Sequence, residues 1–228
     1  MFEPRLNEDN TDPRCACVLL LDTSASMRGV PLTELLAGLR QFAEDVREDT
    51  LARKRVEVSI ISFGGNVQVV TPFTEAQHFE PPQLAAGGAT PLGQAILAGM
   101  QELTQQKRAY KSAGVEYFRP WLVLMTDGSP TDDTSQAVSK LRRLEAKKGV
   151  VVMPIGVGDK ADMQFLSSLS AERSPALMRD VSSFAEFFRW LSASLGSVSV
   201  SASSASSDEG LAGVAQVPLP SPSGWMSA

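Results

Sequence analysis

Near its start the chain reads Cys15-Ala16-Cys17-Val18-Leu19-Leu20-Leu21-Asp22-Thr23-Ser24-Ala25-Ser26. The segment up to Leu21 is continuously apolar, which is typical of a strand buried on both faces of a sheet. The carboxylate of Asp22 and the hydroxyls of Ser24 and Ser26 follow where that strand ends. Ligands of open parallel sheets bind beyond the carboxyl ends of the strands. This stretch therefore predicts a central strand, Cys15–Leu21, with a binding site beyond its end.

Apolar blocks alternate with segments of helical periodicity along the rest of the chain. Further strands are expected at Val56–Phe63, Val67–Thr71, Trp121–Met125, Val150–Val157 and Ala176–Val181. Apolar stripes at helical spacing are expected at 31–46, 92–103, 137–144, 161–169 and 184–195. The short reversal at Gly64-Gly65-Asn66 makes the third strand antiparallel to the second. The pattern predicts an α/β fold with a doubly wound, mostly parallel six-stranded sheet and helices on both faces.

Composition limits the chemistry that the chain can perform. The 228 residues include 26 acidic and 21 basic side chains, a net charge of −5, which argues against binding a nucleic-acid backbone. With 1 His and 2 Cys, most zinc sites and any disulfide framework are excluded. His78 lies in a polar segment and is expected on the surface, and Cys15 and Cys17 are expected to be small buried residues. Any bound cation must therefore be held by oxygen ligands.

The chain divides into an extension at 1–13, one α/β domain at 14–196 and a tail at 197–228. The tail is rich in Ser and Pro and is expected to be disordered, because it lacks the apolar residues of a core. Trp225 is a candidate docking residue within it, although a tail without a specific role explains the composition equally simply. The start of the chain carries no apolar signal-peptide region and no apolar run is long enough to cross a bilayer, so we expect a soluble, cytoplasmic protein.

Polar groups emerge after two further apolar or loop segments. Thr90 precedes the helix expected at 92–103, and Asp127 follows the strand Trp121–Met125. Taken singly, these residues are ordinary loop caps, a helix N-cap and a turn. Together with Asp22, Ser24 and Ser26 they supply two carboxylates and three hydroxyls, the hard oxygen ligands that Mg²⁺ or Mn²⁺ prefers. The sequence therefore predicts a divalent-metal site of Asp22, Ser24, Ser26, Thr90 and Asp127.

The pattern Asp22-x-Ser24-x-Ser26 with Thr90 and Asp127 resembles the metal-ion-dependent adhesion site (MIDAS) of von Willebrand factor A (VWA) domains. The similarity runs from about Cys15 to about Leu195 and includes the step Thr126-Asp127-Gly128. Further segments resemble the stand-alone bacterial tellurite-resistance-associated (TerY-like) group, namely Pro13-Arg14-Cys15, Gly88-Ala89-Thr90-Pro91-Leu92-Gly93, Arg119-Pro120-Trp121 and Gly128-Ser129-Pro130-Thr131-Asp132.

The resemblance implies a sheet ordered 3-2-1-4-5-6 and a complete MIDAS. It implies that Ser24 and Ser26 ligate the metal directly, that Thr90 does so directly or through water, and that Asp22 and Asp127 act largely through water. An Asp or Glu of a protein partner would then complete the metal's coordination. The group further implies stress response, with a serine/threonine kinase and a PP2C-type phosphatase as partners.

Two other functions compete with a metal-dependent, non-enzymatic binding module. In a Mg²⁺-dependent phosphotransferase Asp22 would be the nucleophile, but the residue two positions later is Ser24 and no Gly-rich phosphate loop follows the strand. In a metal-indifferent scaffold the same motif would only hold loops together.

Around the site, Met27 and Arg28 are candidates for partner contact, and Asp132-Asp133 is expected to open a helix or to shape the rim of the metal face.

Overall fold

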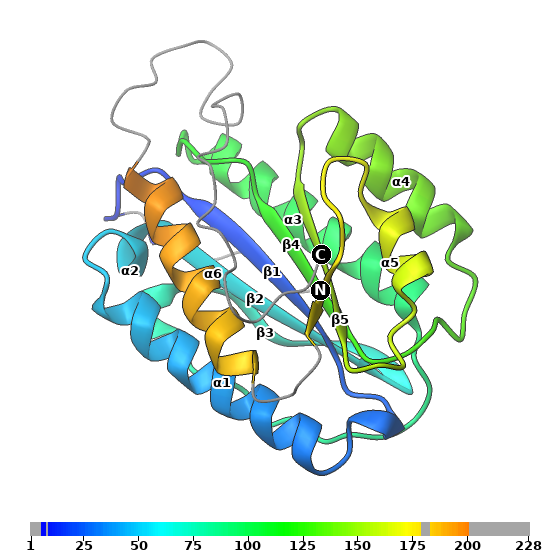
Figure 1. Ribbon diagram of the computed structural model, residues 1–228. Coiled ribbons are helices and arrows are strands. Elements are labelled where there is room, and N and C mark those ends of the chain that lie inside the picture. Colours follow the sequence, from blue (N-terminus) through cyan, green and yellow to red (C-terminus); the bar gives the residue numbers. More distant parts are fainter. Residues whose placement is uncertain (1–5, 8, 179–182, 201–228) are drawn as a thin grey trace.

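A computed structural model describes residues 6, 7, 9–178 and 183–200 of the chain. Its centre is one six-stranded sheet with the order β3-β2-β1-β4-β5-β6, in which all neighbours are parallel except β2 and β3 (Figure 1). This confirms the doubly wound α/β fold expected from the sequence pattern and the strand order that the resemblance implies. The strands are β1 (Cys15–Asp22), β2 (Val56–Gly64), β3 (Asn66–Glu75), β4 (Trp121–Thr126), β5 (Val151–Val157) and β6 (Ala176–Met178).

Helices cover both faces of the sheet (Figure 1). One face carries α1 (Val30–Glu48) and α6 (Ser183–Val200), with the single turn of α2 (Ala52–Arg55) beside them. The other face carries α3 (Leu92–Ser112), α4 (Ser135–Ala146) and α5 (Met163–Leu169). Short 3₁₀ turns, η1 (Ala25–Met27) and η2 (Ala76–His78), follow β1 and β3. No helix in the described ranges is long and apolar enough to cross a membrane.

The central strand β1 explains why its sequence is apolar without alternation. Side chains of successive residues point to opposite faces of a sheet. Accordingly Cys15, Cys17, Leu19 and Leu21 pack with α1 and α6, whereas Ala16, Val18 and Leu20 pack against α3. Each of these residues is at most 1% exposed. The strand is therefore rigidly held, and its last residue, Asp22, is fixed at the edge where β1 ends.

Two expected boundaries are wrong, and a third is only partly covered by the structure. The expected strand Val67–Thr71 continues through Pro72 to Glu75, which is possible because β3 is an edge strand where a missing N–H is tolerated. The last helix continues beyond Leu195 to Val200, past the expected start of the tail at 197. The expected strand Ala176–Val181 is described only to Met178, since 179–182 lie outside the described residues. The rest of the tail, with Trp225, also lies outside them, so its disorder and docking role stay predictions.

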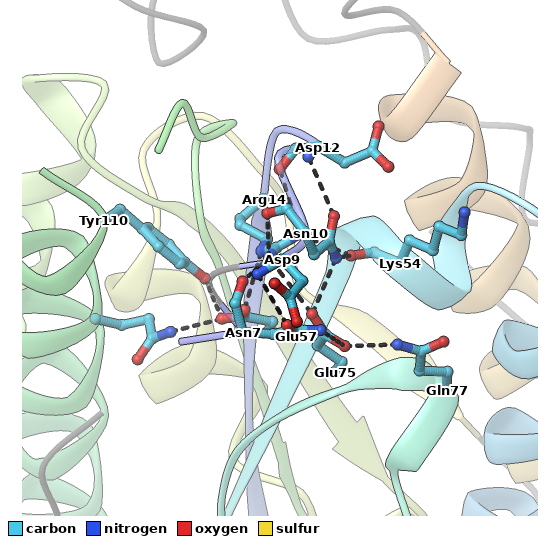
Figure 2. Close-up of polar contacts among 11 residues, drawn as sticks. Asn7, Asp9, Asn10, Asp12, Arg14, Lys54, Glu57, Glu75, Gln77 and Tyr110 are labelled. Atoms are coloured by element: carbon cyan, nitrogen blue, oxygen red, sulfur yellow. Dashed lines mark hydrogen bonds and ion pairs between the residues drawn. The ribbon is translucent and has the colours of Figure 1, made fainter. Parts of the chain in front are cut away.

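The two ends of the sheet differ in their polar residues. We call the end where β1 and β4 finish the carboxyl end, and the end where β1 and β2 begin the amino end. At the amino end Arg14 is fully buried and its guanidinium lies 3.3 Å from Glu57 and 3.4 Å from Glu75 (Figure 2). It also donates to the backbone carbonyls of Asn7, Asn10, Asp12 and Lys54. These bonds attach the described part of the N-terminal extension to the domain.

Candidate metal site at the carboxyl end of the sheet

The strand order places the two predicted carboxylates side by side. β1 and β4 are parallel neighbours in the register Leu21↔Met125, so Asp22 and Thr126 end adjacent strands at the same edge. The hydroxyl of Thr126 donates to Asp22 Oδ2 over 2.5 Å. Asp127 is the next residue along the chain, and the short turn at Gly128 follows it. Strand pairing alone thus brings together Asp22 and Thr126, which are more than 100 residues apart in the sequence.

Four of the five predicted ligands form a continuous hydrogen-bonded chain. The Ser24 backbone N–H donates to Asp22 Oδ1 over 2.7 Å, and the hydroxyls of Ser24 and Ser26 lie 3.0 Å apart. Ser26 Oγ in turn donates to Asp127 Oδ1 over 2.7 Å. Asp22 and Ser24 are buried, whereas Ser26 is exposed. The chain of polar groups therefore runs from the interior to the surface.

The fifth residue, Thr90, is brought to the same place by a loop that backbone hydrogen bonds hold against the first. Gly87 N–H donates to the Thr23 carbonyl over 2.7 Å, and Ala25 N–H donates to the Gly88 carbonyl over 3.1 Å. Thr90 is 7% exposed. Its hydroxyl oxygen lies 4.0 Å from the point that a Cβ on Gly128 would occupy, so it faces the turn that follows Asp127.

This loop packing requires glycine at particular positions. Gly88 has φ +76°, and a Cβ there would lie 2.4 Å from Gly65 Cα. A Cβ on Gly64 would lie 2.2 Å from the Thr23 carbonyl oxygen. Because such distances are far below van der Waals contact, larger residues at either position would displace the loops that carry Ser24 and Thr90.

Electrostatics distinguish this cluster from an ordinary set of loop contacts. Burial raises the pKa of Asp22, hydrogen bonds from Thr126 and Ser24 oppose that rise, and the nearby charge of Asp127 adds to it. Among the described residues, no ion pair includes Asp22 or Asp127. Within the described ranges the two carboxylates therefore meet only neutral donors, which favours a cation from outside.

The donor set fits a hard divalent cation. No group of three or more His, Cys, Asp or Glu side chains that could hold a metal occurs in the part of the chain that the structure describes. A site here must therefore use hydroxyls and water beside the two carboxylates. Mg²⁺ and Mn²⁺ accept that combination, because both prefer oxygen ligands and Mg²⁺ usually keeps several waters. The residues present thus fit the cation that the sequence predicts.

The structure adds supporting residues whose roles the sequence did not reveal. Besides Thr126, Thr131 pairs with Thr90 in both directions, with Thr90 N–H to Thr131 Oγ1 and Thr131 N–H to the Thr90 carbonyl at 3.0 Å each. Asp132 accepts hydrogen bonds from the backbone N–H groups of Gly93 and Gln94 at 2.9 Å. The available signal was the polar run after β4, since each polar residue there could reach the neighbouring loop.

Two expectations about the rim of the site are corrected. Asp132 does not open the helix that follows it but binds the first turn of α3, and only Asp133 contacts α4, by accepting from the Ser135 N–H. Met27 is 2% exposed and belongs to the core under α1, so it is not available to a partner. Arg28 is exposed, and its Nε donates to the Ala86 carbonyl over 3.3 Å.

The remaining residues singled out in the sequence lie away from this cluster. Cys15 and Cys17 are fully buried, and burial, followed by the charge of Glu57, raises the pKa of Cys15 to about 12. Cys15 is therefore held as an inert thiol at neutral pH. His78 is exposed at the end of η2, as its polar surroundings predicted.

The fold and the cluster define a class: an α/β domain with a central parallel sheet and an oxygen-rich candidate site at its carboxyl end. The family model of the von Willebrand factor type A domain matches residues 17–190, and the chain belongs to this family. VWA domains are typically interaction modules rather than enzymes, and they are often metal-dependent.

Individual relatives support the fold. The chain is 28% identical to rat (Rattus norvegicus) von Willebrand factor over 149 residues, which cover 62% of this chain and 32% of that protein. A von Willebrand factor type A structure from Catenulispora acidiphila is similar with a TM-score of 0.56 at 21% identity, over 81% of this chain and 43% of that chain. The chain thus spans less than half the length of either relative.

Two similar structures contain metal. Proximal thread matrix protein 1 of the mussel byssus, with a zinc-occupied MIDAS motif, has a TM-score of 0.56 at 19% identity, over 82% of this chain and 48% of that chain. Manganese-loaded TRAP protein of Plasmodium vivax has a TM-score of 0.54 at 18% identity, over 77% of this chain and 73% of that chain. At these identities the likeness shows the shared fold.

Proposed function

We propose that Asp22, Ser24, Ser26, Thr90 and Asp127 bind Mg²⁺ or Mn²⁺ as a complete MIDAS, and that the bound cation accepts an Asp or Glu from a protein partner. The observation that carries this proposal is the pair of neighbouring carboxylates, one of them 1% exposed, that no cation of the described chain neutralises. A divalent cation would supply that charge and a Lewis-acid position for a partner's carboxylate.

Each residue has a role that its contacts support. The hydroxyls of Ser24 and Ser26 would contact the cation, with Thr90 beside them from the second loop. Asp22 is held in place by Thr126 and by the Ser24 N–H, so it is suited to act through a water molecule. Asp127 accepts from Ser26 and would act in the same way. If both carboxylates stand back from the cation, it retains more attraction for a carboxylate of the partner.

The same contacts disfavour a phosphotransferase. A nucleophilic Asp22 would need a free oxygen facing solvent, yet it is 1% exposed and each of its carboxylate oxygens accepts a hydrogen bond. We therefore propose a non-enzymatic, cytoplasmic binding module. We extend the proposal to the bacterial tellurite-resistance-associated group, with a serine/threonine kinase and a PP2C-type phosphatase of a stress-response system as its partners.

Calorimetric titration of the full chain with Mg²⁺ and with Mn²⁺ tests the metal site. Asp22→Ala and Ser26→Ala are expected to abolish binding while the circular dichroism spectrum is unchanged. Ser129→Ala is the matched control, because Ser129 is an exposed hydroxyl residue in the adjacent turn and is not among the proposed ligands. Saturation at 100 times the dissociation constant should also stabilise the wild type by about 2.7 kcal/mol. Equal metal affinity in the wild type and Asp22→Ala would refute the site.

Partner binding needs a separate measurement. A purified serine/threonine kinase and a purified PP2C-type phosphatase of the same organism would be tested in Mg²⁺ and in EDTA, with Asp22→Ala as the second control. The proposal expects binding in Mg²⁺ that is lost both in EDTA and in the variant. Binding that persists in EDTA would instead support the metal-indifferent scaffold, in which the chain of hydrogen bonds from Asp22 to Asp127 only holds the loops.

A further inference from the structure

A shallow groove lies between α3 and α4, on the face of the sheet opposite α6. It has a volume of about 620 Å³, within the range of ligand-binding pockets. Leu97, Met100 and Leu144 supply its apolar side chains, and Arg108 and Lys140 supply its charges. Uncharged polar residues of α3 complete the lining, which contains no Asp or Glu.

The cations of this groove have no acidic partner in the described chain. None of the ion pairs found among the described residues includes Arg108 or Lys140, and both residues are exposed. Two more cations, Lys107 and Lys111, lie on α3 beside them; burial, and then the charge of Lys111, lowers the pKa of Lys107. An apolar floor with unpaired cations fits an acidic segment that also carries an apolar side chain. The lining has no aromatic residue on which a nucleic-acid base could stack.

The chain itself contains such a segment. Beyond Arg189 the sequence has only two charged residues, the adjacent Asp208 and Glu209, and Leu211 and Val214 follow them. This acidic and apolar combination complements both the cations and the floor of the groove.

The position of α6 allows that segment to reach the groove. A Cβ on Gly196 would lie 2.8 Å from Oδ2 of Asp49, the residue that follows the end of α1. The end of α6 therefore lies beside the end of α1, at the amino end of the sheet, as Figure 1 also shows. The last turns of α3 reach the same end, where Tyr110 donates to Glu57. Asp208 follows Val200 by eight residues, which span up to about 28 Å when extended. Passing from one helical layer to the other around the end of the sheet requires about 20 Å, since packed layers are separated by about 10 Å.

We propose that residues 208–214 occupy the groove between α3 and α4 of the same chain. Asp208 and Glu209 face Arg108 and Lys140, and Leu211 packs against Leu97, Met100 and Leu144. The contact with Arg108 lies toward the amino end of the sheet, away from the metal site proposed at the carboxyl end.

Paramagnetic relaxation in the full chain, measured in EDTA, tests the proposal. A nitroxide on Ser206→Cys leaves the protein otherwise unlabelled, because Cys15 and Cys17 are 0% exposed. The amide signals of 101–108 and 140–144 are expected to lose most of their intensity, while those of α1 on the other face are retained. Raising the salt concentration should weaken the effect, since exposed charges are screened.

Charge reversal decides whether the contact is the one proposed. Arg108→Glu with Lys140→Glu should restore the signals, and adding Asp208→Lys with Glu209→Lys should bring the broadening back. Arg40→Glu, an exposed cation on α1, is the matched control and should change nothing. Absence of broadening, or broadening that survives the charge reversal, overturns the proposal. Broadening that appears only between a spin-labelled copy and a separate isotope-labelled copy assigns the groove to a second molecule and overturns it as well.

Discussion

The two ends of the sheet differ in the groups that contact their buried carboxylates. At the amino end Glu57 and Glu75 are 3% and 8% exposed, and the chain supplies one cation, Arg14, that contacts both. At the carboxyl end Asp22 is buried beside Asp127, and the described chain supplies hydroxyls and backbone N–H groups but no cation. Both clusters lie beside β1, so the difference comes from the residues and not from the fold.

The difference shows which cluster is complete without a ligand. Tyr110, Gln106, Asn7, Asn10 and Gln77 donate to the carboxylates around Arg14 (Figure 2), so nothing from outside is required there. The carboxylates at the carboxyl end also accept hydrogen bonds, but no cation of the described residues contacts them. A cluster that holds its own cation is structural, whereas a cluster that lacks one is suited to bind a cation.

The largest expected effect is at the amino end. Arg14→Met leaves two buried carboxylates without their cation, which is expected to lower the free energy of unfolding by about 3–5 kcal/mol. Urea denaturation measures this change. Arg14→Lys, which keeps the charge but cannot reach all four backbone carbonyls, should unfold between the wild type and Arg14→Met. Its intermediate stability keeps the test informative if Arg14→Met does not fold.

Two matched variants sharpen that comparison. Arg55 pairs with Asp12 in a partly exposed ion pair, so Arg55→Met should cost no more than about 1 kcal/mol. Asp22→Asn in EDTA leaves no cation unpaired, and Asn can still accept from Ser24 and donate to Thr126, so it should also cost about 1 kcal/mol or less. If Asp22→Asn destabilised the metal-free protein as much as Arg14→Met, the distinction between the two ends would fail.

A smaller effect is expected at Asp132, which connects the turn after β4 to the first turn of α3. Asp132→Ala removes two hydrogen bonds to the N-terminus of α3 and should lower the free energy of unfolding by about 1 kcal/mol. Because α3 begins just after Thr90, the variant should also weaken metal binding. Titration calorimetry alongside Asp133→Ala checks this, since Asp133 contacts α4 instead. Equal metal affinity in both variants would show that α3 does not position Thr90.

Much of the site at the carboxyl end could be predicted from the sequence, because each of its residues lies in a short segment that is recognisable by itself. Strand β1 is uniformly apolar and is followed at once by polar residues, and the alternation of strands and helices places similar loops at one edge. The polar residues of each such loop can be identified separately from the others. In the structure all five predicted ligands lie in one region, and each belongs to the loop in which the sequence placed it.

The amino end could not be predicted in that way. Arg14, Glu57 and Glu75 are charged residues that a pattern of strands and helices assigns to the surface, and their burial depends on three-dimensional pairing across separate strands. The same limit applies to Met27, whose position beside the site suggested partner contact although its side chain packs under α1. The role of Asp132 also depends on a contact between the turn after β4 and the first turn of α3 that the sequence does not record.

The smallest effect concerns pH, and the two glutamates of the amino end should act in opposite directions. Burial alone raises the pKa of Glu75, but hydrogen bonds from Asn10, Gln77 and Asn7, with the charge of Arg14, bring it below 4.5. The folded state therefore binds this proton less tightly than the unfolded state, and the resulting stability is lost as the pH falls below 4.5. Burial raises the pKa of Glu57 above 4.5 despite its bonds with Tyr110, Arg14 and Gln106, so its contribution is lost as the pH rises above 4.5.

Urea denaturation across this pH range should resolve the two slopes. Glu75→Gln is expected to flatten the loss of unfolding free energy below pH 4.5, and Glu57→Gln should flatten the decline above it. The comparison uses the slope with pH, so a constant loss of stability in either variant does not affect it. If both variants altered the same side of pH 4.5, the opposite pKa shifts of the two glutamates beside Arg14 would be refuted, and the contrast with the carboxyl end would rest on the presence of Arg14 alone.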